Sequence, residues 1–274
     1  WGLGRLSIGL NAEGEFVQEA GTYVQCRGSY FVKLAGNSGG KGTYTMNGGT
    51  LRANGFYWSL YGGNDPSMYA RWDINSTDVD IVLGSQREGA YASNRCTGIQ
   101  LGYNTGENAV RCYWSAVEGL PGQTGADGQT VQIEIVGGQF KIRMRGAGGR
   151  DADVAGLNNI TLKFTKNPIP GDPSSSISTL EVAGKDIGAE VAGLCNNFAL
   201  EGLIVGGEAG GDDATYLDLT DDWDNMVDGD DNEALYVNVL KVNADSELWL
   251  NGHNLYYYKS DGIDGDAVSY THLR

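Results

Sequence analysis

The chain has 274 residues and a formal net charge of -16, with 43 glycines but only 5 prolines. This glycine content, without a Gly-X-Y period or abundant proline, excludes collagen, and the 41% of hydrophobic residues excludes wholesale disorder. A pI of about 4.4 without a basic cluster excludes a nucleic-acid surface, and no apolar run reaches the ~18 residues of a membrane helix. We therefore expect neither a nucleic-acid partner nor membrane insertion of this segment.

A repeat with a period of 28 positions marks the first part of the chain. Residues 14–22 align with residues 42–50 and, more weakly, with residues 70–74. Each repeat carries one aromatic residue at the same place: Phe16, Tyr44 and Trp72. Short apolar runs closed by Gly, Asn, Asp or Ser recur between these positions, which is the pattern of strands and turns.

The period predicts a right-handed parallel β-solenoid, or β-helix, over residues 1–117. Equivalent residues of successive coils would then stack one strand spacing apart, ~4.8 Å, so the three aromatic side chains are expected to form a structural ladder. Glycine suits the sharp corners between strands, where φ is often positive. The alternative is a β-sandwich whose hairpins resemble one another.

Residues 118–173 depart from this repeat. Alternating apolar and polar residues at 131–135 and 140–144, separated by Gly137 and Gly138, predict an antiparallel hairpin. Three of the five prolines fall within residues 168–173, which indicates a linker. We therefore predict a hairpin insertion followed by a linker.

A second β-repeat region is expected over residues 174–267. Residues 197–200 resemble residues 232–235, with an offset of 35 positions. The final residues, 268–274, are expected to be a non-native tail, because residues 268–273 match one reading frame of a sequencing adapter. An ordinary strand tail is the alternative.

Several segments of this second region, taken in order, carry a family resemblance. They are residues 179–184, 197–200, 217–225, 233–237 and 250–257. Their sequence resembles large secreted bacterial proteins that have glycine-rich autotransporter-like β-strand repeats and end in a dockerin or a PEP-CTERM sorting segment. His253 departs from the pattern, in which Leu is expected. The resemblance implies a β-solenoid and export to the medium or the bacterial cell surface, and it implies no catalytic activity.

Acidic residues gather in glycine-rich stretches near the end of the second region. Six of them are candidate ligands for Ca²⁺: Asp221, Asp222, Asp224, Asp228, Asp230 and Asp231. Calcium takes six to eight hard oxygen ligands, which flexible carboxylate-rich loops supply. An EF-hand is not satisfied, because Met226 and Leu235 fall where oxygen ligands are required. A solvated acidic loop is the alternative.

The cysteine and histidine residues do not form a pattern typical of a metal site or a catalytic site. The four cysteines form no C-x-x-C pair, and only His253 lies outside the expected non-native tail, so we expect no zinc site and no histidine-based catalysis. Cys96 and Cys112 would close the shortest disulfide loop, which an exported protein permits. Cys26 and Cys195 are expected to be buried.

Two functions are compatible with this sequence. The first is a non-catalytic structural or adhesive segment of a secreted or cell-surface protein, with extracellular polysaccharide or other surface proteins as partners. The alternative is a polysaccharide-binding or polysaccharide-cleaving β-helix, a lyase or glycosidase, because two carboxylates suffice for glycoside hydrolysis and exposed aromatic rings stack on sugars. The candidate aromatics are Tyr57, Trp58, Tyr61 and residues 256–258. No catalytic residue is assigned.

Overall fold

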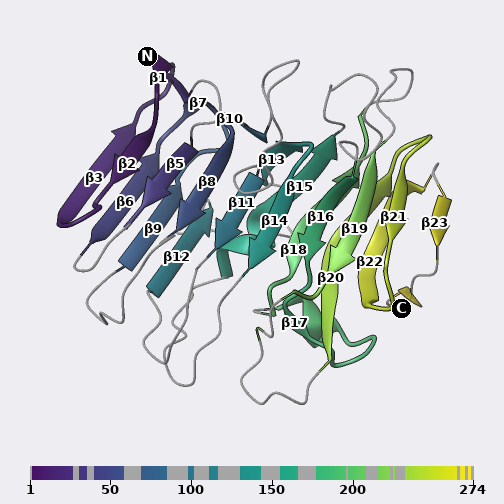
Figure 1. The fold of residues 1–274 in the computed structure, drawn as a ribbon. Helices are drawn as coiled ribbons and strands as arrows, with labels where there is room; N and C mark the ends of the chain where they lie inside the picture. The colour runs from purple at the N-terminus through teal and green to yellow at the C-terminus, as the bar shows by residue number, and fades with distance from the viewer. Residues whose placement is uncertain are drawn as a thin grey trace.

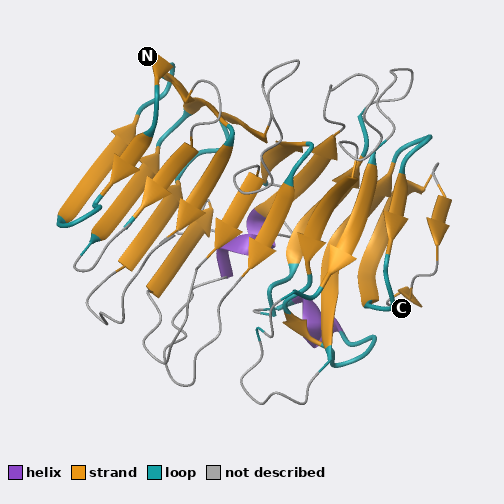
Figure 2. Cartoon of the chain, viewed as in Figure 1, coloured by secondary structure: helices purple, strands orange, loops and turns teal. Residues whose placement is uncertain are grey.

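The structure of the chain is a computed structural model. It describes residues 2–26, 31–35, 40–58, 69–84, 98–101, 111–116, 130–142, 155–165, 177–195, 197–207, 215–222, 225, 232–263, 266–268 and 271–272. Within these ranges the chain is all-β: nearly all regular structure is strand, interrupted by short 3-10 helices (Figure 2). Almost every strand pair is parallel, which contradicts the alternative of a β-sandwich built from antiparallel hairpins.

Sheet A has eleven strands and extends through the described chain from one end to the other. In pairing order its strands are β1 (Gly2–Leu3), β4 (Tyr23–Cys26), β7 (Gly49–Ala53), β10 (Val79–Gly84), β13 (Val131–Val136), β15 (Ile160–Thr165), β18 (Leu200–Val205), β20 (Glu233–Val242), β22 (Asn254–Ile263) and β24 (Thr271–His272). The eleventh, β17 (Gly184–Lys185), pairs antiparallel with β20.

Sheet B has nine strands, all paired in parallel. They are β2 (Leu6–Ile8), β5 (Phe31–Leu34), β8 (Gly55–Trp58), β11 (Gly98–Leu101), β14 (Gln139–Ile142), β16 (Ile177–Glu181), β19 (Tyr216–Thr220), β21 (Glu247–Trp249) and β23 (Asp266–Val268).

Sheet C is shorter, with four parallel strands. They are β3 (Glu13–Gln18), β6 (Lys41–Met46), β9 (Tyr69–Ile74) and β12 (Arg111–Ala116). The 3-10 helix η2 (Ala155–Asn159) packs against β12, beyond which sheet C does not continue in the described residues.

The chain visits the sheets in a fixed rotation. Up to β12 it passes from sheet A to B to C and back, so that each strand pairs with the strand three places later in sequence, such as β3 with β6. From β13 onwards it alternates mainly between sheets A and B. The strands accordingly lie side by side in chain order, from the purple N-terminal end to the yellow C-terminal end of Figure 1.

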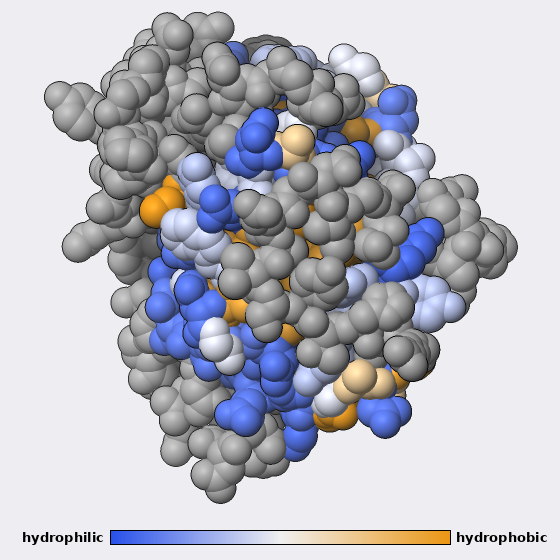
Figure 3. Space-filling model, turned by 90° about the vertical axis from the view of Figure 1, so that its right-hand side faces the viewer, coloured by the Kyte–Doolittle hydropathy of each residue, from blue (hydrophilic) through white to orange (hydrophobic). Residues whose placement is uncertain are grey.

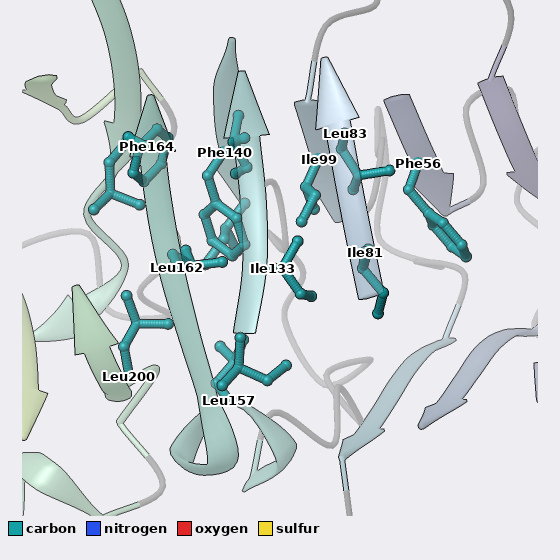
Figure 4. Close-up of a cluster of buried hydrophobic side chains, with 14 of the residues drawn as sticks. Phe56, Ile81, Leu83, Ile99, Ile133, Phe140, Leu157, Leu162, Phe164 and Leu200 are labelled. Carbon is teal, nitrogen blue, oxygen red and sulfur yellow. The ribbon is translucent and has the colours of Figure 1, made fainter. Parts of the chain in front are cut away.

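The hydrophobic core lies between the sheets. Apolar residues at alternate positions of many of the described strands are buried, for example Ile81 and Leu83 of β10 and Ile133 of β13. Figure 4 shows these side chains, with Phe140 of β14 and Ile99 of β11, pointing into one shared interior. Burial of one such side chain contributes about 1.5 to 3 kcal/mol, so this repeated stripe of residues is the main source of stability.

The chain length between paired residues varies widely although the register of the core is kept. Leu51 pairs with Ile81, 30 positions later in the sequence, whereas Ile81 pairs with Ile133, 52 positions later. Loop closure costs only slightly more as a loop lengthens, so extra residues inserted between strands are tolerated. This variation explains why the 28-residue period fades after its third copy.

The predicted antiparallel hairpin is wrong. Strands β13 and β14 lie in different sheets, and β13 pairs in parallel with β10 and β15. Gly137 has φ of 53° and its N–H donates to the carbonyl of Thr165, 2.9 Å away, so the glycine pair forms a corner between sheets instead of a hairpin turn. Alternation was a correct sign of strands with one buried face, but it does not distinguish a hairpin from a corner.

The offset of 35 in the second repeat is also wrong. Leu200 pairs with Val237 and Val205 with Val242, an offset of 37. The matched segments overlap the strands, since Leu200 begins β18 and residues 233–235 begin β20, but Leu200 pairs two positions beyond Leu235, its counterpart in the match. The match between these segments was therefore local and did not set the register.

Candidate functional site

The outer side of sheet B carries the most distinctive group of polar and aromatic side chains. Leu180, Leu217 and Leu248 point into the core, so the residues alternating with them on β16, β19 and β21 point outwards. Six residues form what we call the outer B face: Ile177, Thr179, Tyr216, Asp218, Glu247 and Trp249.

Strand register arranges these six residues as a grid. One row across the strands is Ile177, Tyr216 and Glu247; the next is Thr179, Asp218 and Trp249. Adjacent members of a row come from neighbouring strands, which lie ~4.8 Å apart. The face therefore brings together residues that are far apart in the sequence.

Two aromatic rings meet on this face. The ring centroids of Tyr216 and Trp249 are 5.6 Å apart, with an angle of 41° between the planes. The Trp249 indole N–H donates to Oε2 of Glu247 at 2.6 Å, which fixes the orientation of the ring. Ile177 stands beside Tyr216 and is 38% exposed. The result is a partly exposed apolar surface with a carboxylate at its edge.

Asp218 lies next to Trp249 in the same row. Partial burial raises the pKa of its carboxyl group, and a hydrogen bond with Asn251 opposes this rise. Its Oδ1 atom is shielded from solvent, and no donor within the described part of the chain reaches it. Within the described ranges, Oδ1 of Asp218 is therefore a shielded acceptor that has no hydrogen-bond donor.

Further charges border the outer B face. Glu181, on β16, is 1% exposed and accepts a hydrogen bond from the Thr220 hydroxyl at 3.3 Å. Lys141, on β14, makes an ion pair with Asp222, with 3.1 Å between Nζ and Oδ2. Lys141 is thus already paired, and Glu181 and Glu247 make the surroundings acidic.

A second polar cluster lies on the outer side of sheet A. Residues 184–195 cover two stacked tyrosines, Tyr236 and Tyr256, whose ring centroids are 4.9 Å apart. Asp186 accepts hydrogen bonds from the Tyr256 hydroxyl (3.0 Å) and from Asn254 (2.7 Å), and Tyr236 donates to the carbonyl of Gly188 (2.9 Å). All of these groups are satisfied by one another, so the cluster holds the covering segment in place.

The predicted aromatic ladder residues are brought together. Phe16 pairs with Tyr44, and Tyr44 with Trp72, along sheet C. The Tyr44 and Trp72 rings are nearly parallel with centroids 6.2 Å apart, whereas Phe16 meets Tyr44 edge-on at 5.2 Å. Phe56, which enters from sheet B, stacks on Trp72 at 3.9 Å.

Of the six predicted calcium ligands, only two lie in the described residues. Asp221 and Asp222 are exposed, and Asp222 is engaged with Lys141. The remaining four lie outside: Asp224, Asp228, Asp230 and Asp231. Among the residues that the structure describes, no three His, Cys, Asp or Glu side chains are grouped as a metal site requires. The calcium site stays a prediction.

The predicted disulfide cannot be placed, since Cys96 and the side chain of Cys112 lie outside the described residues. Cys26 is buried, as expected, and burial raises the pKa of its thiol. The expectation of burial is wrong for Cys195, which is exposed because it follows directly after the surface 3-10 helix η4 (Val191–Leu194).

Most of the aromatic residues proposed to stack on sugars are not available for that role. Tyr57, Tyr256 and Tyr257 are all buried, whereas Tyr258 is 56% exposed. The side chain of Trp58 and all of Tyr61 lie outside the described residues. Sequence reasoning missed Tyr216 and Trp249, although the alternation of residues 216–220 was a signal that every second side chain there points outwards.

The described residues on the side of the molecule that carries the last strands are mostly polar (Figure 3). Figure 3 views the side that carries the last strands of Figure 1, where most of the visible described residues are hydrophilic and the hydrophobic ones form small spots. No helix in the described residues is long and apolar enough to cross a membrane. The sequence matches no protein-family model, and searches of curated proteins and of solved structures found no match.

Proposed function

We propose that the chain is a right-handed parallel β-solenoid that serves as a structural or adhesive segment of a secreted or cell-surface protein. The observation that carries the proposal is the pairing order of sheet A, in which ten strands from β1 to β24 follow one another in chain order and in parallel. Right-handedness is favoured because crossover connections between parallel strands are right-handed in nearly all proteins.

A stack of this kind suits a structural role. Each coil contacts only its neighbours, so the body grows by repetition and presents long lateral faces. The sheets on these faces are held by regular backbone pairing, and loops of very different length project between them. The net charge of -16 favours solubility and repulsion between copies.

The coil architecture can be tested by engineered disulfides between paired residues. Val82 on β10 pairs with Glu134 on β13, and neighbouring Cα atoms in a sheet lie within the range that a disulfide bridges. We expect the double variant Val82→Cys/Glu134→Cys to form this bond, detected by mass spectrometry of a non-reducing digest. The control pair Val82→Cys/Gln132→Cys is two residues out of register and should not bridge. Equal bridging of both pairs would contradict the solenoid.

The non-catalytic role is tested separately. The purified chain is incubated with a panel of polysaccharides, and new reducing ends or unsaturated products are measured. We expect no turnover, because the proposed role depends on shape and surface. Turnover that is lost on substitution of a described carboxylate, such as Glu181→Gln, would replace this proposal with the lyase or glycosidase alternative.

A further inference from the structure

We propose that the outer B face binds a neutral, hydroxyl-rich polysaccharide chain, held by stacking on the Tyr216–Trp249 pair and by hydrogen bonds to Asp218. The inference rests on the proposed function, since it names the partner of an adhesive segment. It uses different residues from those that the sequence indicated.

The aromatic pair supplies the apolar half of the interaction. A pyranose ring has one face of C–H groups, which packs on an aromatic ring, while its hydroxyl groups point outwards around the edge. The Trp249 indole is preorganised by its bond to Glu247, so little side-chain freedom is lost when a ligand binds. Ile177 extends the apolar area beside Tyr216.

Asp218 supplies the polar half. Asp218 is partly exposed on this face beside Trp249, although its Oδ1 atom is itself shielded from solvent. A sugar hydroxyl beside the Trp249 ring would donate to the solvent-facing side of this carboxylate, not to the shielded Oδ1. Thr179 stands on the other side of Asp218 in the same row and adds a hydroxyl that both donates and accepts.

Charge selects between classes of polysaccharide. Glu247 is part of this face, Glu181 lies beside it on β16, and Lys141 is already paired with Asp222. An acidic polysaccharide would bring further carboxylates or sulfates close to these groups, and like charges repel most strongly where solvent is partly excluded. A neutral chain avoids this cost, so the face fits neutral glycans and rejects acidic ones.

The test measures binding of the full chain to defined oligosaccharides by isothermal titration calorimetry. The neutral probes are cellohexaose, xylohexaose, mannohexaose and laminarihexaose, and the acidic probe is hexagalacturonate. We expect at least one neutral probe to bind with a dissociation constant between about 1 μM and 1 mM, and hexagalacturonate not to bind.

Variants locate the site. Trp249→Ala should weaken binding of the neutral probe at least tenfold, and Asp218→Asn several-fold, whereas Trp249→Phe retains a ring and most of the affinity. The matched control is Tyr258→Ala, which removes an exposed aromatic ring from sheet A and should leave affinity unchanged. Near-UV circular dichroism of each variant shows that the fold is kept, and Asp218→Asn, which preserves size, still tests the site if Trp249→Ala unfolds.

Three results would overturn the proposal: no neutral probe binds, hexagalacturonate binds as tightly as the best neutral probe, or Trp249→Ala and Tyr258→Ala weaken binding equally. Failure of the proposed function gives a different pattern. If Val82→Cys and Glu134→Cys bridge normally but no neutral probe binds, the solenoid stands and only the glycan site is wrong.

Discussion

The hydroxyl group of Tyr44 donates a hydrogen bond to the side-chain oxygen of Gln18 on the neighbouring strand of sheet C, and both side chains are completely buried. The Gln18 amide in turn donates to the carbonyl oxygens of Thr22 (3.1 Å) and Thr50 (3.0 Å). This network ties the aromatic ladder to the corner that leads from sheet C to sheet A. Burial also raises the pKa of Tyr44 far above its usual value, so the hydroxyl stays a donor at every physiological pH.

Replacing Tyr44 with Phe is therefore expected to destabilise the protein by about 1 to 3 kcal/mol, because it leaves the buried Gln18 oxygen without a donor. Urea denaturation followed by circular dichroism measures the change. The control is Tyr258→Phe, at a tyrosine that is 56% exposed, where we expect a change within about 0.5 kcal/mol. Equal stability of the two variants would show that the Tyr44–Gln18 bond contributes nothing.

Substitution of Phe56, which stacks on Trp72, is expected to destabilise the protein more than Tyr44→Phe does. Phe56 is fully buried, with its ring centroid 3.9 Å from that of Trp72 and 5.8 Å from that of Tyr44. Phe56→Ala should cost about 3 to 5 kcal/mol through lost burial and a cavity. Phe56→Leu, which keeps most of the volume but removes the ring, should cost less. A loss below about 1 kcal/mol for Phe56→Ala, measured by urea denaturation, would mean that the ladder is not a stabilising core.

The sequence indicated the first three strands of sheet C well because the spacing between them is constant, unlike the spacing in sheets A and B. Phe16, Tyr44 and Trp72 recur at a constant spacing of 28 positions, and the backbone register repeats with the same offset. The next strand continues the register with Trp114 opposite Trp72, but at the longer spacing of 42 positions. A period search misses this step, because the added residues lie between strands where core packing does not constrain their number.

The outer B face could not be predicted from the sequence, for a related reason. Tyr216 and Trp249 are 33 positions apart and come together only through the pairing of β19 with β21. Alternation predicts which side chains leave the core, but not which strand lies next to which. The hairpin predicted at Gly137 failed in the same way, since the local pattern was right and the pairing partner was wrong.

The tyrosine pair on sheet A predicts a loss of stability at alkaline pH. Burial, together with the neighbouring Asp186 carboxylate, raises the pKa of Tyr256 to about 12 from its ordinary value of 10.0. Above pH 10 the unfolded chain releases this proton while the folded chain keeps it, so stability falls as pH rises from about 10 to 12. Tyr256→Phe removes this contribution.

The check is the free energy of unfolding from pH 9 to pH 12 for wild-type protein and Tyr256→Phe. We expect a flatter pH dependence in the variant. Tyr258→Phe serves as the control at an exposed tyrosine on the same strand and should follow the wild-type curve. Identical slopes for wild type and Tyr256→Phe would contradict the assigned role of burial at Tyr256.

Calcium binding by the acidic stretch after β19 predicts a metal-dependent melting temperature. We expect millimolar Ca²⁺ to raise the melting temperature relative to EDTA. When the Ca²⁺ concentration is ten times the dissociation constant, binding adds about 1.4 kcal/mol to the free energy of unfolding. Mg²⁺ should do less, because it requires a tighter octahedral site. Asp230→Asn/Asp231→Asn should abolish the difference, and identical midpoints of wild-type protein in Ca²⁺ and EDTA would remove the calcium site.

Ionisation of Asp218 is expected to destabilise the fold, whereas ionisation of a carboxylate with a lowered pKa stabilises it. Because burial raises its pKa, the folded chain holds a proton that the unfolded chain has already released above the ordinary aspartate pKa of 3.8. Stability therefore falls as pH rises from about 4 through the folded pKa, and Asp218→Asn, which cannot ionise, should be more stable than wild type at pH 7. The difference should vanish below about pH 4, where wild-type Asp218 is neutral in both states.

Urea denaturation between pH 3 and pH 7 measures this difference, with Glu15→Gln, at an exposed site on the edge strand β3, as the control that should show no such trend. If Asp218→Asn is more stable but binds the glycan more weakly, the carboxylate increases glycan affinity and decreases the stability of the fold. An Asp218→Asn variant that is less stable at pH 7 would instead give this residue a role in holding the sheet together.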